Sequence, residues 1–274
     1  MKNVMLLAGA GQIGMAIARR VGYGMKIVIG DKRRENAEAI ADTMNKAGFT
    51  TVPVEMDLSS RASILALIDT AQQYGEISML VNAAGVSPSQ ASIETILKVD
   101  LYGTAVLLEE VGKVISKGGV GVTVSSQSGH RMPALGIELD EQLATAPTEE
   151  LLTLEALQPQ NIRDTLHAYQ MAKRCNVKRV MAEAVKWGNR GAQTYFVSVG
   201  PVQNDPYCSN AEIESFNAAM QANLSGVTYI DVYSHLVSEG FSTVDGTHYP
   251  DSVSVDIYNY ILDHLEEQRS GIWG

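Results

Sequence analysis

The segment Gly9-Ala10-Gly11-Gln12-Ile13-Gly14 constrains the fold of this chain more than any other part of its sequence. It follows an apolar run, Val4 to Ala8, and precedes apolar residues at helical spacing, Ile17 and Val21. This order predicts a strand, a tight turn and a helix. Glycines there let the backbone approach a pyrophosphate at the helix N-terminus, whereas the alternative is a close turn without a ligand. The residues expected to bind a dinucleotide in this turn are Gly9, Gly11, Gln12, Ile13 and Gly14.

The same alternation of strand and helix continues along the chain. Further strands are expected at residues 26–30, 51–56, 78–82, 120–125, 194–199 and 227–232. Further helices are expected at residues 36–47, 62–74, 92–115, 162–187, 211–222 and 253–268. The pattern predicts an α/β protein of the Rossmann-like, doubly wound class, a three-layer sandwich around a parallel sheet of about seven strands. We expect residues 1–274 to form a single α/β domain, with residues 131–161 as an inserted helical arm.

Asp31 lies at the end of the second expected strand, 17 positions after Gly14. A carboxylate there accepts hydrogen bonds from both ribose hydroxyls of NAD and repels the 2′-phosphate of NADP. Lys32 and Arg33 leave NADP open, because an adjacent guanidinium can bind a phosphate, although both cations fit a solvated helix start equally well. NAD is the favoured cofactor.

Tyr169 and Lys173 are four positions apart in the helix expected over residues 162–187, so their side chains share one face. A phenol has a reference pKa of about 10, and a nearby ammonium favours its ionised form. The pair is therefore a candidate acid–base centre, provided that the two groups are close and poorly solvated.

Several motifs together resemble the short-chain dehydrogenase/reductase family over about residues 1–192. They are Gly9 to Gly14, Asp31, Asp57-Leu58, Asn82-Ala83-Ala84-Gly85, Val124-Ser125-Ser126 and Tyr169-Gln-Met-Ala-Lys173. The resemblance implies that Tyr169 is the general acid and base, and that Lys173 holds the nicotinamide ribose and makes Tyr169 more acidic. It also implies that Ser126 binds the substrate carbonyl, that Asp57 meets the adenine amino group and that Asn82 to Gly85 line the cofactor cleft.

The chain departs from this family in three places. The glycine spacing is of the general Rossmann type, and Asp100 stands where the family has an asparagine, from which it can still position a water. Ser126 and Tyr169 are 43 positions apart, and the arm between them resembles that of bacterial hydroxysteroid dehydrogenases and carbonyl reductases. We expect the arm to cover the substrate, to alter an oligomer interface or to be an inert surface excursion.

The charge distribution changes near Thr194. Of 21 basic and 31 acidic residues, 20 of each precede Thr194, so 1 basic and 11 acidic residues follow, and the net charge of −10 arises there. This part resembles the closing third of an SGNH (GDSL-type) hydrolase, with Asp245 and His248 in its DxxH motif. The hydrolase serine and its oxyanion residues are absent, so a loop histidine bonded to Asp245 is the favoured alternative.

The two resemblances together predict an engineered chimera, with residues 1–192 as the NAD-binding part and residues 193–274 as grafted hydrolase-like units. The favoured hypothesis is an NAD(H)-binding chimera in which hydride transfer is weak or lost. The alternatives are an active dehydrogenase for a secondary alcohol or ketone, and a designed fold without activity. Hydrolase activity is not expected.

The motifs and the family resemblance imply a dinucleotide and a small carbonyl or alcohol substrate as partners, and composition argues against other classes. The acidic balance argues against nucleic acid, and no apolar run reaches the roughly 18 residues of a membrane span. Two cysteines, Cys175 and Cys208, make no disulfide framework and no metal site, so a cytoplasmic location is expected. The oligomeric state is left open.

Overall fold

The computed structural model describes residues 3–199 without a break, then residues 209–211 and 232–241 and single positions between 214 and 263. The chain separates into two compact units, residues 1–199 and residues 200–274. The first unit contains every residue that is expected to bind a dinucleotide or to take part in hydride transfer.

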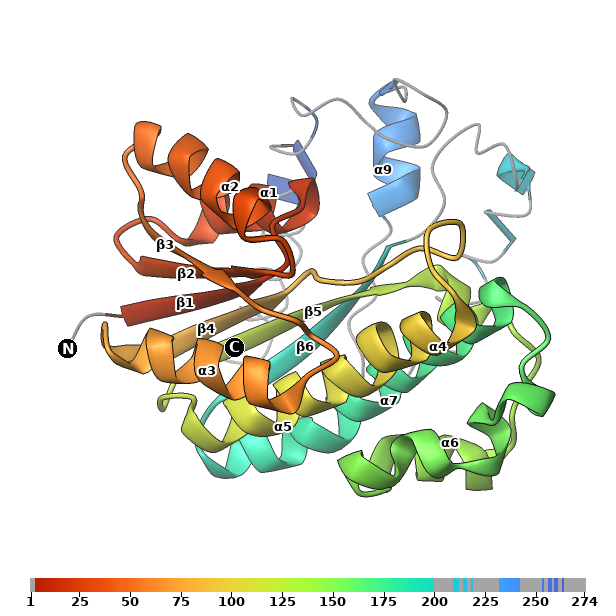
Figure 1. Ribbon diagram of the computed structural model, residues 1–274. Helices are drawn as coiled ribbons and strands as arrows, with labels where there is room; N and C mark the ends of the chain where they lie inside the picture. The colour runs from red at the N-terminus through yellow and green to blue at the C-terminus, as the bar shows by residue number, and fades with distance from the viewer. Residues whose placement is uncertain are drawn as a thin grey trace. The chain divides into compact units, whose positions relative to one another are not determined.

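Six parallel strands form the sheet of the first unit, in the order β3-β2-β1-β4-β5-β6 (Figure 1). They are β1 (Asn3–Ala8), β2 (Lys26–Asp31), β3 (Thr50–Glu55), β4 (Glu76–Asn82), β5 (Val120–Ser126) and β6 (Gln193–Val199). The order reverses between β1 and β4, where the loops at the carboxyl ends diverge and leave room for a ligand. The predicted doubly wound α/β class is confirmed.

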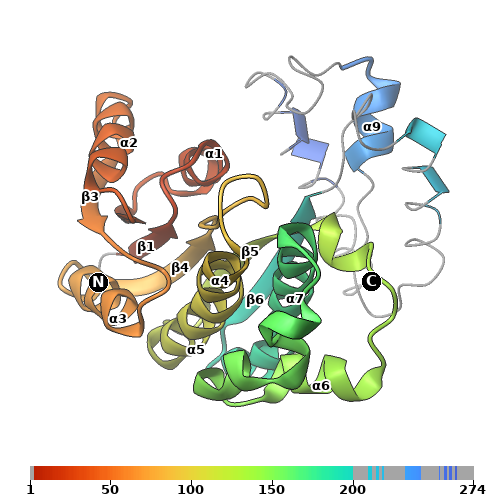
Figure 2. The same ribbon diagram turned by 45° about the vertical axis from the view of Figure 1, so that its right-hand side comes forward.

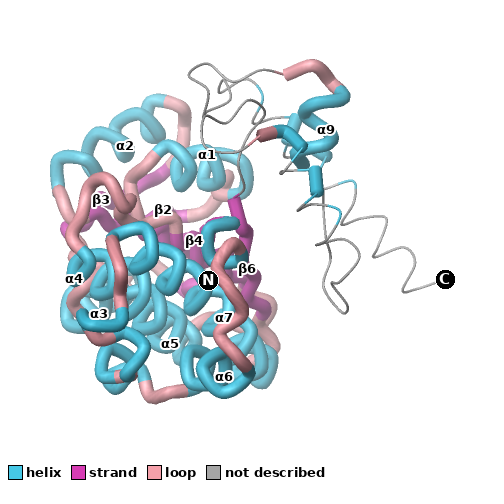
Figure 3. The backbone as a smooth tube through the Cα atoms, turned by 90° about the vertical axis from the view of Figure 1, so that its right-hand side faces the viewer, coloured by secondary structure: helices cyan, strands magenta, loops and turns pink. Residues whose placement is uncertain are grey.

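Helices cover both faces of this sheet, as Figures 1 and 3 show. One face carries α1 (Gln12–Val21) and α2 (Arg34–Lys46), and the other carries α3 (Arg61–Gln72), α5 (Thr104–Val114) and α7 (Thr165–Asn189). Along β1, Leu6 packs into a core with residues of α3, α5 and α7, whereas Met5 and Leu7 pack with residues of α1 and α2. Because strand side chains alternate between faces and both faces are covered, β1 is apolar from Val4 to Ala8.

The helix expected over residues 92–115 is regular only at its two ends. Helix α4 (Ile93–Ile96) begins at the N-cap Ser92, whose hydroxyl accepts a hydrogen bond from Thr95 N, and α5 forms the other end. Between them, Leu97–Gly103 forms a π-helical segment, in which each turn holds more residues than in an α-helix. Apolar periodicity does not distinguish a π turn from an α-helical turn, so the sequence carries no sign of it. Asp100 lies at the centre of this π segment.

The arm of residues 131–161 contains helix α6 (Ile137–Thr145) and three short 3₁₀ turns, Thr148–Thr153, Glu155–Leu157 and Pro159–Asn161. Leu143, Leu151 and Leu157 of the arm are buried in one cluster with residues of the π segment and of α7. Asp140 adds a paired contact with Arg174 of α7, at 2.6 Å for both of its oxygens. Figure 2 shows α6 beside α7. The arm therefore has an apolar core of its own against the body of the first unit.

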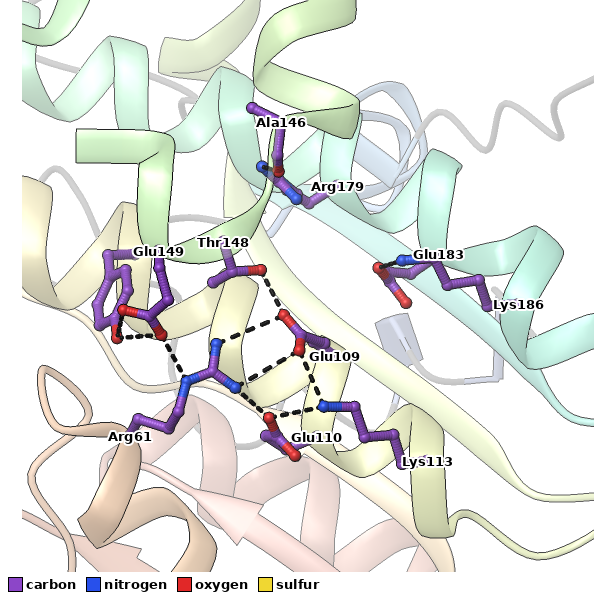
Figure 4. A network of polar contacts seen from close by, with 11 residues as sticks. Arg61, Glu109, Glu110, Lys113, Ala146, Thr148, Glu149, Arg179, Glu183 and Lys186 are labelled. Carbon is purple, nitrogen blue, oxygen red and sulfur yellow. Dashed lines mark hydrogen bonds and ion pairs between the residues drawn. The ribbon is translucent and has the colours of Figure 1, made fainter. Parts of the chain in front are cut away.

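A network of charged side chains fastens the arm to α3 and α5 (Figure 4). Arg61 of α3 pairs with Glu109 and Glu110 of α5, and its Nε lies 2.6 Å from Oε1 of Glu149 in the arm. Thr148 of the arm donates a hydrogen bond of 2.5 Å to Glu109. Three segments that are far apart in the sequence are thus joined at one guanidinium.

The seventh expected strand, residues 227–232, lies almost wholly outside the described residues. Its last position, Val232, begins helix α9 (Val232–Ser238) instead of ending a strand. Within the second unit, Leu236 of this helix is buried.

Candidate active site

The glycine turn joins β1 to α1 at the carboxyl edge of the sheet. Gly9 has a φ of +97°, and a Cβ there would lie 2.6 Å from Ala84 N. A Cβ on the buried Gly14 would lie 2.7 Å from Gly9 O. Gly11 is the N-cap of α1 and, among the described residues, no side chain caps this helix. Its first N–H groups are therefore available to an anion. Gln12 and Ile13, the first two residues of α1, are exposed.

Asp31 ends β2 and lies against the glycine turn. Its Oδ2 accepts a hydrogen bond from Ala10 N at 3.0 Å, and its Oδ1 accepts one from Arg33 N at 3.0 Å. When the Asn36 amide is oriented with its oxygen toward Arg33, the Arg33 guanidinium donates to that oxygen at 2.8 and 3.1 Å; in the opposite orientation Asn36 Nδ2 donates to Asp31 Oδ1 at 3.3 Å. A carboxylate has about four acceptor positions, so Asp31 keeps capacity for ribose hydroxyls.

Asp57 follows β3, and its carboxylate is already engaged. Ser59 donates to Oδ1 through its backbone N and its Oγ, at 2.9 and 2.6 Å, and Lys32 Nζ lies 3.2 Å from Oδ2. Burial opposes the change, but Ser59 and Lys32 lower the pKa of Asp57 below its ordinary value. The next residue, Leu58, is buried, and its carbonyl lies close to Gly103 of the π segment.

The segment Asn82-Ala83-Ala84-Gly85 continues from β4 along the glycine turn. Ala83 N donates to Ala8 O at 2.8 Å, and Ala84 is the residue that a side chain on Gly9 would meet. Asn82 is buried, and its Nδ2 donates to Thr104 Oγ1 at 3.3 Å. The structure thus brings this motif and the glycine turn together, as a shared cofactor site requires.

Ser126 is the last residue of β5. Its Oγ accepts a hydrogen bond from Ser128 N at 3.1 Å, so its own proton remains available for a substrate oxygen. Its neighbour Ser125 donates to Lys173 O at 3.0 Å. Gly129 lies so close to α7 that a Cβ there would be 2.6 Å from Arg174 N. These contacts hold the Ser126 segment against the turn of α7 that carries Lys173.

Tyr169 and Lys173 lie one turn apart on α7. Lys173 is 5% exposed, and its Nζ lies 5.2 Å from the centroid of the Tyr169 ring. Oδ2 of Asp100, which is 0% exposed, lies 3.5 Å from the same Nζ, and Oδ1 of Asp100 accepts a hydrogen bond from Val86 N at 2.8 Å. Burial raises the pKa of Asp100, although Lys173 and the Val86 N–H oppose that rise. The three expected reactive residues on the helices therefore form one group, in which Asp100 and Lys173 are buried and Tyr169 is partly buried.

Similarity to known proteins agrees with this geometry. A family model described as short chain dehydrogenase matches residues 2–137. The short-chain dehydrogenase/reductase bsc3 of Alternaria brassicicola is 32% identical over 203 residues, which cover 74% of each protein. The chain belongs to the short-chain dehydrogenase/reductase family. The family resemblance carried by the sequence motifs is confirmed.

Other relatives of this dehydrogenase match over shorter stretches. Tropinone reductase-like 3 of Erythroxylum coca is 27% identical over 48% of this chain, which spans 55% of that relative. The 7alpha-hydroxysteroid dehydrogenase of Bacteroides fragilis is 35% identical over 38% of this chain and 41% of its own length. This chain thus spans about half the length of these two relatives.

A solved structure shares the fold of this dehydrogenase. The short-chain dehydrogenase/reductase of Serratia marcescens has a TM-score of 0.57 and 19% identity, and the match covers 93% of this chain and 88% of that one. At this identity the likeness shows the fold alone. The covered share exceeds residues 1–192, so the match gives no support to a fusion with a hydrolase.

Short-chain dehydrogenases use an NAD(P) dinucleotide, and the described residues fit such a group. The open amide end of α1 suits a pyrophosphate, and a side chain at Gly9 would fill the space beside it. The free acceptor positions of Asp31 suit ribose hydroxyls. Both observations concern the adenosine half of the cofactor.

Two residues of this site escaped the sequence analysis. Asn176 is buried one turn after Lys173. In the amide orientation that pairs both of its polar atoms, its side-chain nitrogen donates to Asp100 O at 2.8 Å and to Ala172 O at 3.1 Å. The available signal was its position three residues after Lys173, on the same helix face.

The second missed residue is His130, four positions after Ser126. Its Nε2 lies 2.9 Å from Ser198 Oγ on β6. Burial lowers the pKa of His130, and Arg174 and Lys178 lower it further, which favours the neutral imidazole. No sequence motif marks this contact, because Ser198 comes from another strand.

The expected hydrolase pair, Asp245 and His248, lies outside the described residues. In the second unit the described pair is His235 with Asp256, at 2.5 Å, and the Tyr260 ring stacks on His235 at 3.9 Å. Over the described ranges, no group of three His, Cys, Asp or Glu side chains is placed to hold a metal. No helix in the described part of the chain is long and apolar enough to cross a membrane.

Proposed function

We propose that this short-chain dehydrogenase is an active, NAD(H)-dependent oxidoreductase that interconverts a secondary alcohol and a ketone. The observation that supports it most is the Lys173 ammonium, buried 5.2 Å from the Tyr169 ring. Burying an ammonium costs free energy unless nearby groups compensate for its charge. An ammonium beside a phenol favours loss of the phenolic proton. Ser126 is the third residue of the proposed catalytic group, and its segment is fastened to the same turn of α7.

Each side chain has a distinct part in the proposed reaction. Gly9, Gly14 and Asp31 would hold NADH, which would supply the hydride for the carbonyl carbon. Ser126 Oγ–H donates to the carbonyl oxygen, and Tyr169 Oη–H transfers its proton to that oxygen; in alcohol oxidation Tyr169 accepts the proton instead. Lys173 stabilises the phenolate and would hold the ribose hydroxyls of the cofactor.

The experiment that tests the proposal is a panel of cyclic and aromatic ketones assayed with NADH at 340 nm, together with Tyr169→Phe. We expect turnover by the unchanged chain and a loss of at least about 10²-fold in kcat for Tyr169→Phe, because a positioned acid contributes that much. NADH binding, measured by calorimetry, is expected to survive.

Tyr23→Phe is the matched control, because Tyr23 is a surface residue outside the site, 84% exposed. Its activity is expected to be unchanged. A Tyr169→Phe variant that turns over as fast as the unchanged chain would refute the assignment of the acid.

We also propose that NAD is preferred over NADP. Asp31 places a negative charge where a 2′-phosphate would lie. Lys32 and Arg33, the two cations that made NADP an alternative, are occupied by Asp57 and Asn36.

Asp57→Asn tests the preference, because it releases Lys32. We expect the ratio of NADPH to NADH affinity to rise by up to about 5-fold, as for one surface ion pair. Calorimetry with both dinucleotides measures this ratio. Asp42→Asn, which breaks the exposed pair of Asp42 with Lys46 on α2, is the control and is expected to leave the ratio unchanged. An unchanged ratio in Asp57→Asn would show that Lys32 does not determine the preference.

No observation favours the hypotheses of a chimera with weak or lost hydride transfer, of an engineered fold without activity or of a hydrolase. A folded chain that binds NADH but reduces no member of the ketone panel is the result that the first hypothesis predicts. The Tyr169 experiment therefore distinguishes it from the proposed enzyme.

A further inference from the structure

Two residues on one face of α7, Lys173 and Asn176, contact the side chain and the backbone of Asp100. Its Oδ2 lies 3.5 Å from Lys173 Nζ, and its backbone oxygen accepts a hydrogen bond of 2.8 Å from the Asn176 side chain. Its Oδ1 accepts the Val86 N–H. Both the charge and the backbone of Asp100 are thus anchored.

The space around the carboxylate leaves it little freedom to turn away from Lys173. A Cβ on Gly85 would lie 3.3 Å from both carboxylate oxygens, so the backbone of the loop after β4 packs directly on them. The wide turn of the π segment supplies the other side of this enclosure. The distance between the two charges is therefore a fixed property of the fold.

The charged and titratable groups near Asp100 are few. Helix α7 presents Lys173 and, beyond it, Tyr169, whereas the loop after β4 presents only the backbone of Gly85 and Val86. Lys173 is the one charged group that acts on Asp100 among the described residues. Away from water, charges at this spacing act strongly on one another.

We propose that Asp100 is a positioning residue that acts through Lys173. Its negative charge offsets part of the attraction of the Lys173 ammonium for the ionised Tyr169. The proposed reaction consequently runs at a higher pH than it would with an uncharged residue at position 100. This inference rests on the proposed function of Tyr169 as the acid and base.

Asp100→Asn tests the inference, because the amide oxygen can still accept the Val86 N–H while the charge is removed. The measurement is the pH dependence of kcat/KM for alcohol oxidation with NAD⁺, using the alcohol of the best ketone in the panel. We expect the midpoint of the rise to move about one unit toward acid, a tenfold change in proton affinity.

Glu183→Gln is the matched control. Glu183 is a well buried carboxylate on α7 itself, and it pairs with Lys186 at 2.6 Å instead of with Lys173. Its removal is expected to leave the midpoint in place. An equal shift in Glu183→Gln would overturn the inference, because the effect would then not be specific to Asp100.

A titration of tyrosine labelled with ¹³C at Cζ gives a second readout that needs neither substrate nor cofactor. The Tyr169 resonance is assigned by its loss in Tyr169→Phe, and its midpoint is expected to shift toward acid in Asp100→Asn. If that variant does not fold, Asp100→Ser removes the same charge. A folded neutral variant with an unchanged Tyr169 midpoint overturns the inference. Absence of turnover in the unchanged chain, with a shifted Tyr169 midpoint, would contradict the proposed function alone.

Discussion

Two groups of charged side chains in the first unit are built in opposite ways. In the Arg61 cluster, formed by Arg61, Glu109, Glu110, Lys113 and Glu149, the charges share several partners and are in part exposed, 25% for Arg61 and 64% for Glu149. In the pair of Asp100 and Lys173, each charge has a single charged partner within the part of the chain that the structure describes, and both side chains are buried.

The Arg61 cluster is suited to a structural role, whereas the pair of Asp100 and Lys173 is suited to a chemical one. In the Arg61 cluster, water and the remaining partners compensate for a lost charge, so the cluster fastens the arm robustly. In the buried pair no second charge among the described residues compensates, so the field of each charge acts on its neighbour with little screening. A buried pair of this kind is therefore suited to act electrostatically on the neighbouring Tyr169.

The largest expected effect comes from Lys173→Met, which leaves the Asp100 carboxylate buried without its cation. Removing one partner of a buried pair destabilises proteins by about 3–5 kcal/mol. Urea unfolding at pH 7 measures the loss. Lys113→Met, in the Arg61 cluster, is the control and is expected to cost less than about 1 kcal/mol, because Lys113 is 55% exposed. Equal losses in the two variants would remove the distinction between the groups.

A smaller effect is expected from Arg61→Met, which keeps the aliphatic stem but removes the contacts to α5 and the arm. We expect a loss of about 1–2 kcal/mol in the free energy of unfolding, and faster hydrogen exchange over residues 148–153 than in the unchanged chain. Exchange in β1 and β4 serves as the internal reference. If the arm exchanged no faster, the cluster would not be what holds it.

A pH dependence of stability is also expected, and it arises from Glu109. Burial opposes the change, but hydrogen bonds from Thr148, Lys113 and Arg61 lower the pKa of Glu109 from 4.5 to about 2. Because this pKa is lower in the folded chain, the stabilisation is full above about pH 4.5 and is lost as the pH falls toward 2. Glu109→Gln should therefore flatten the fall in unfolding free energy over this range, measured by urea titrations at several pH values. An equally steep fall would contradict it.

Much of the fold was predictable because its signals are local in the sequence. The apolar runs and the glycine turn indicate β1, α1 and the sheet edge where Gly9 and Asp31 lie, since they depend on neighbours in the chain. Helix α7 was predicted in the same way, and with it the shared face of Tyr169 and Lys173.

The rest was not predictable because it depends on contacts between distant segments. The pairing of Lys32 with Asp57 and the contact of Asn176 with Asp100 join different elements, and neither has a characteristic spacing. The change in charge at Thr194 lies close to the boundary between the two units, at residues 199 and 200. The change in composition thus indicated a position near that boundary. It did not indicate the evolutionary origin of the part that follows, and the hydrolase interpretation is without support.

The π segment lets one short stretch of chain contribute to two separate cores. A π turn accommodates one residue more than an α turn between the same flanks. Val99 packs into the core that contains residues of α3 and α5, whereas Leu97 and Leu101 pack with residues of the arm and of α7. Ile96 before the segment and Leu107 after it are both fully buried. Asp100 is thus flanked in the sequence by residues of both cores, and a change of length in this segment would disturb both of them.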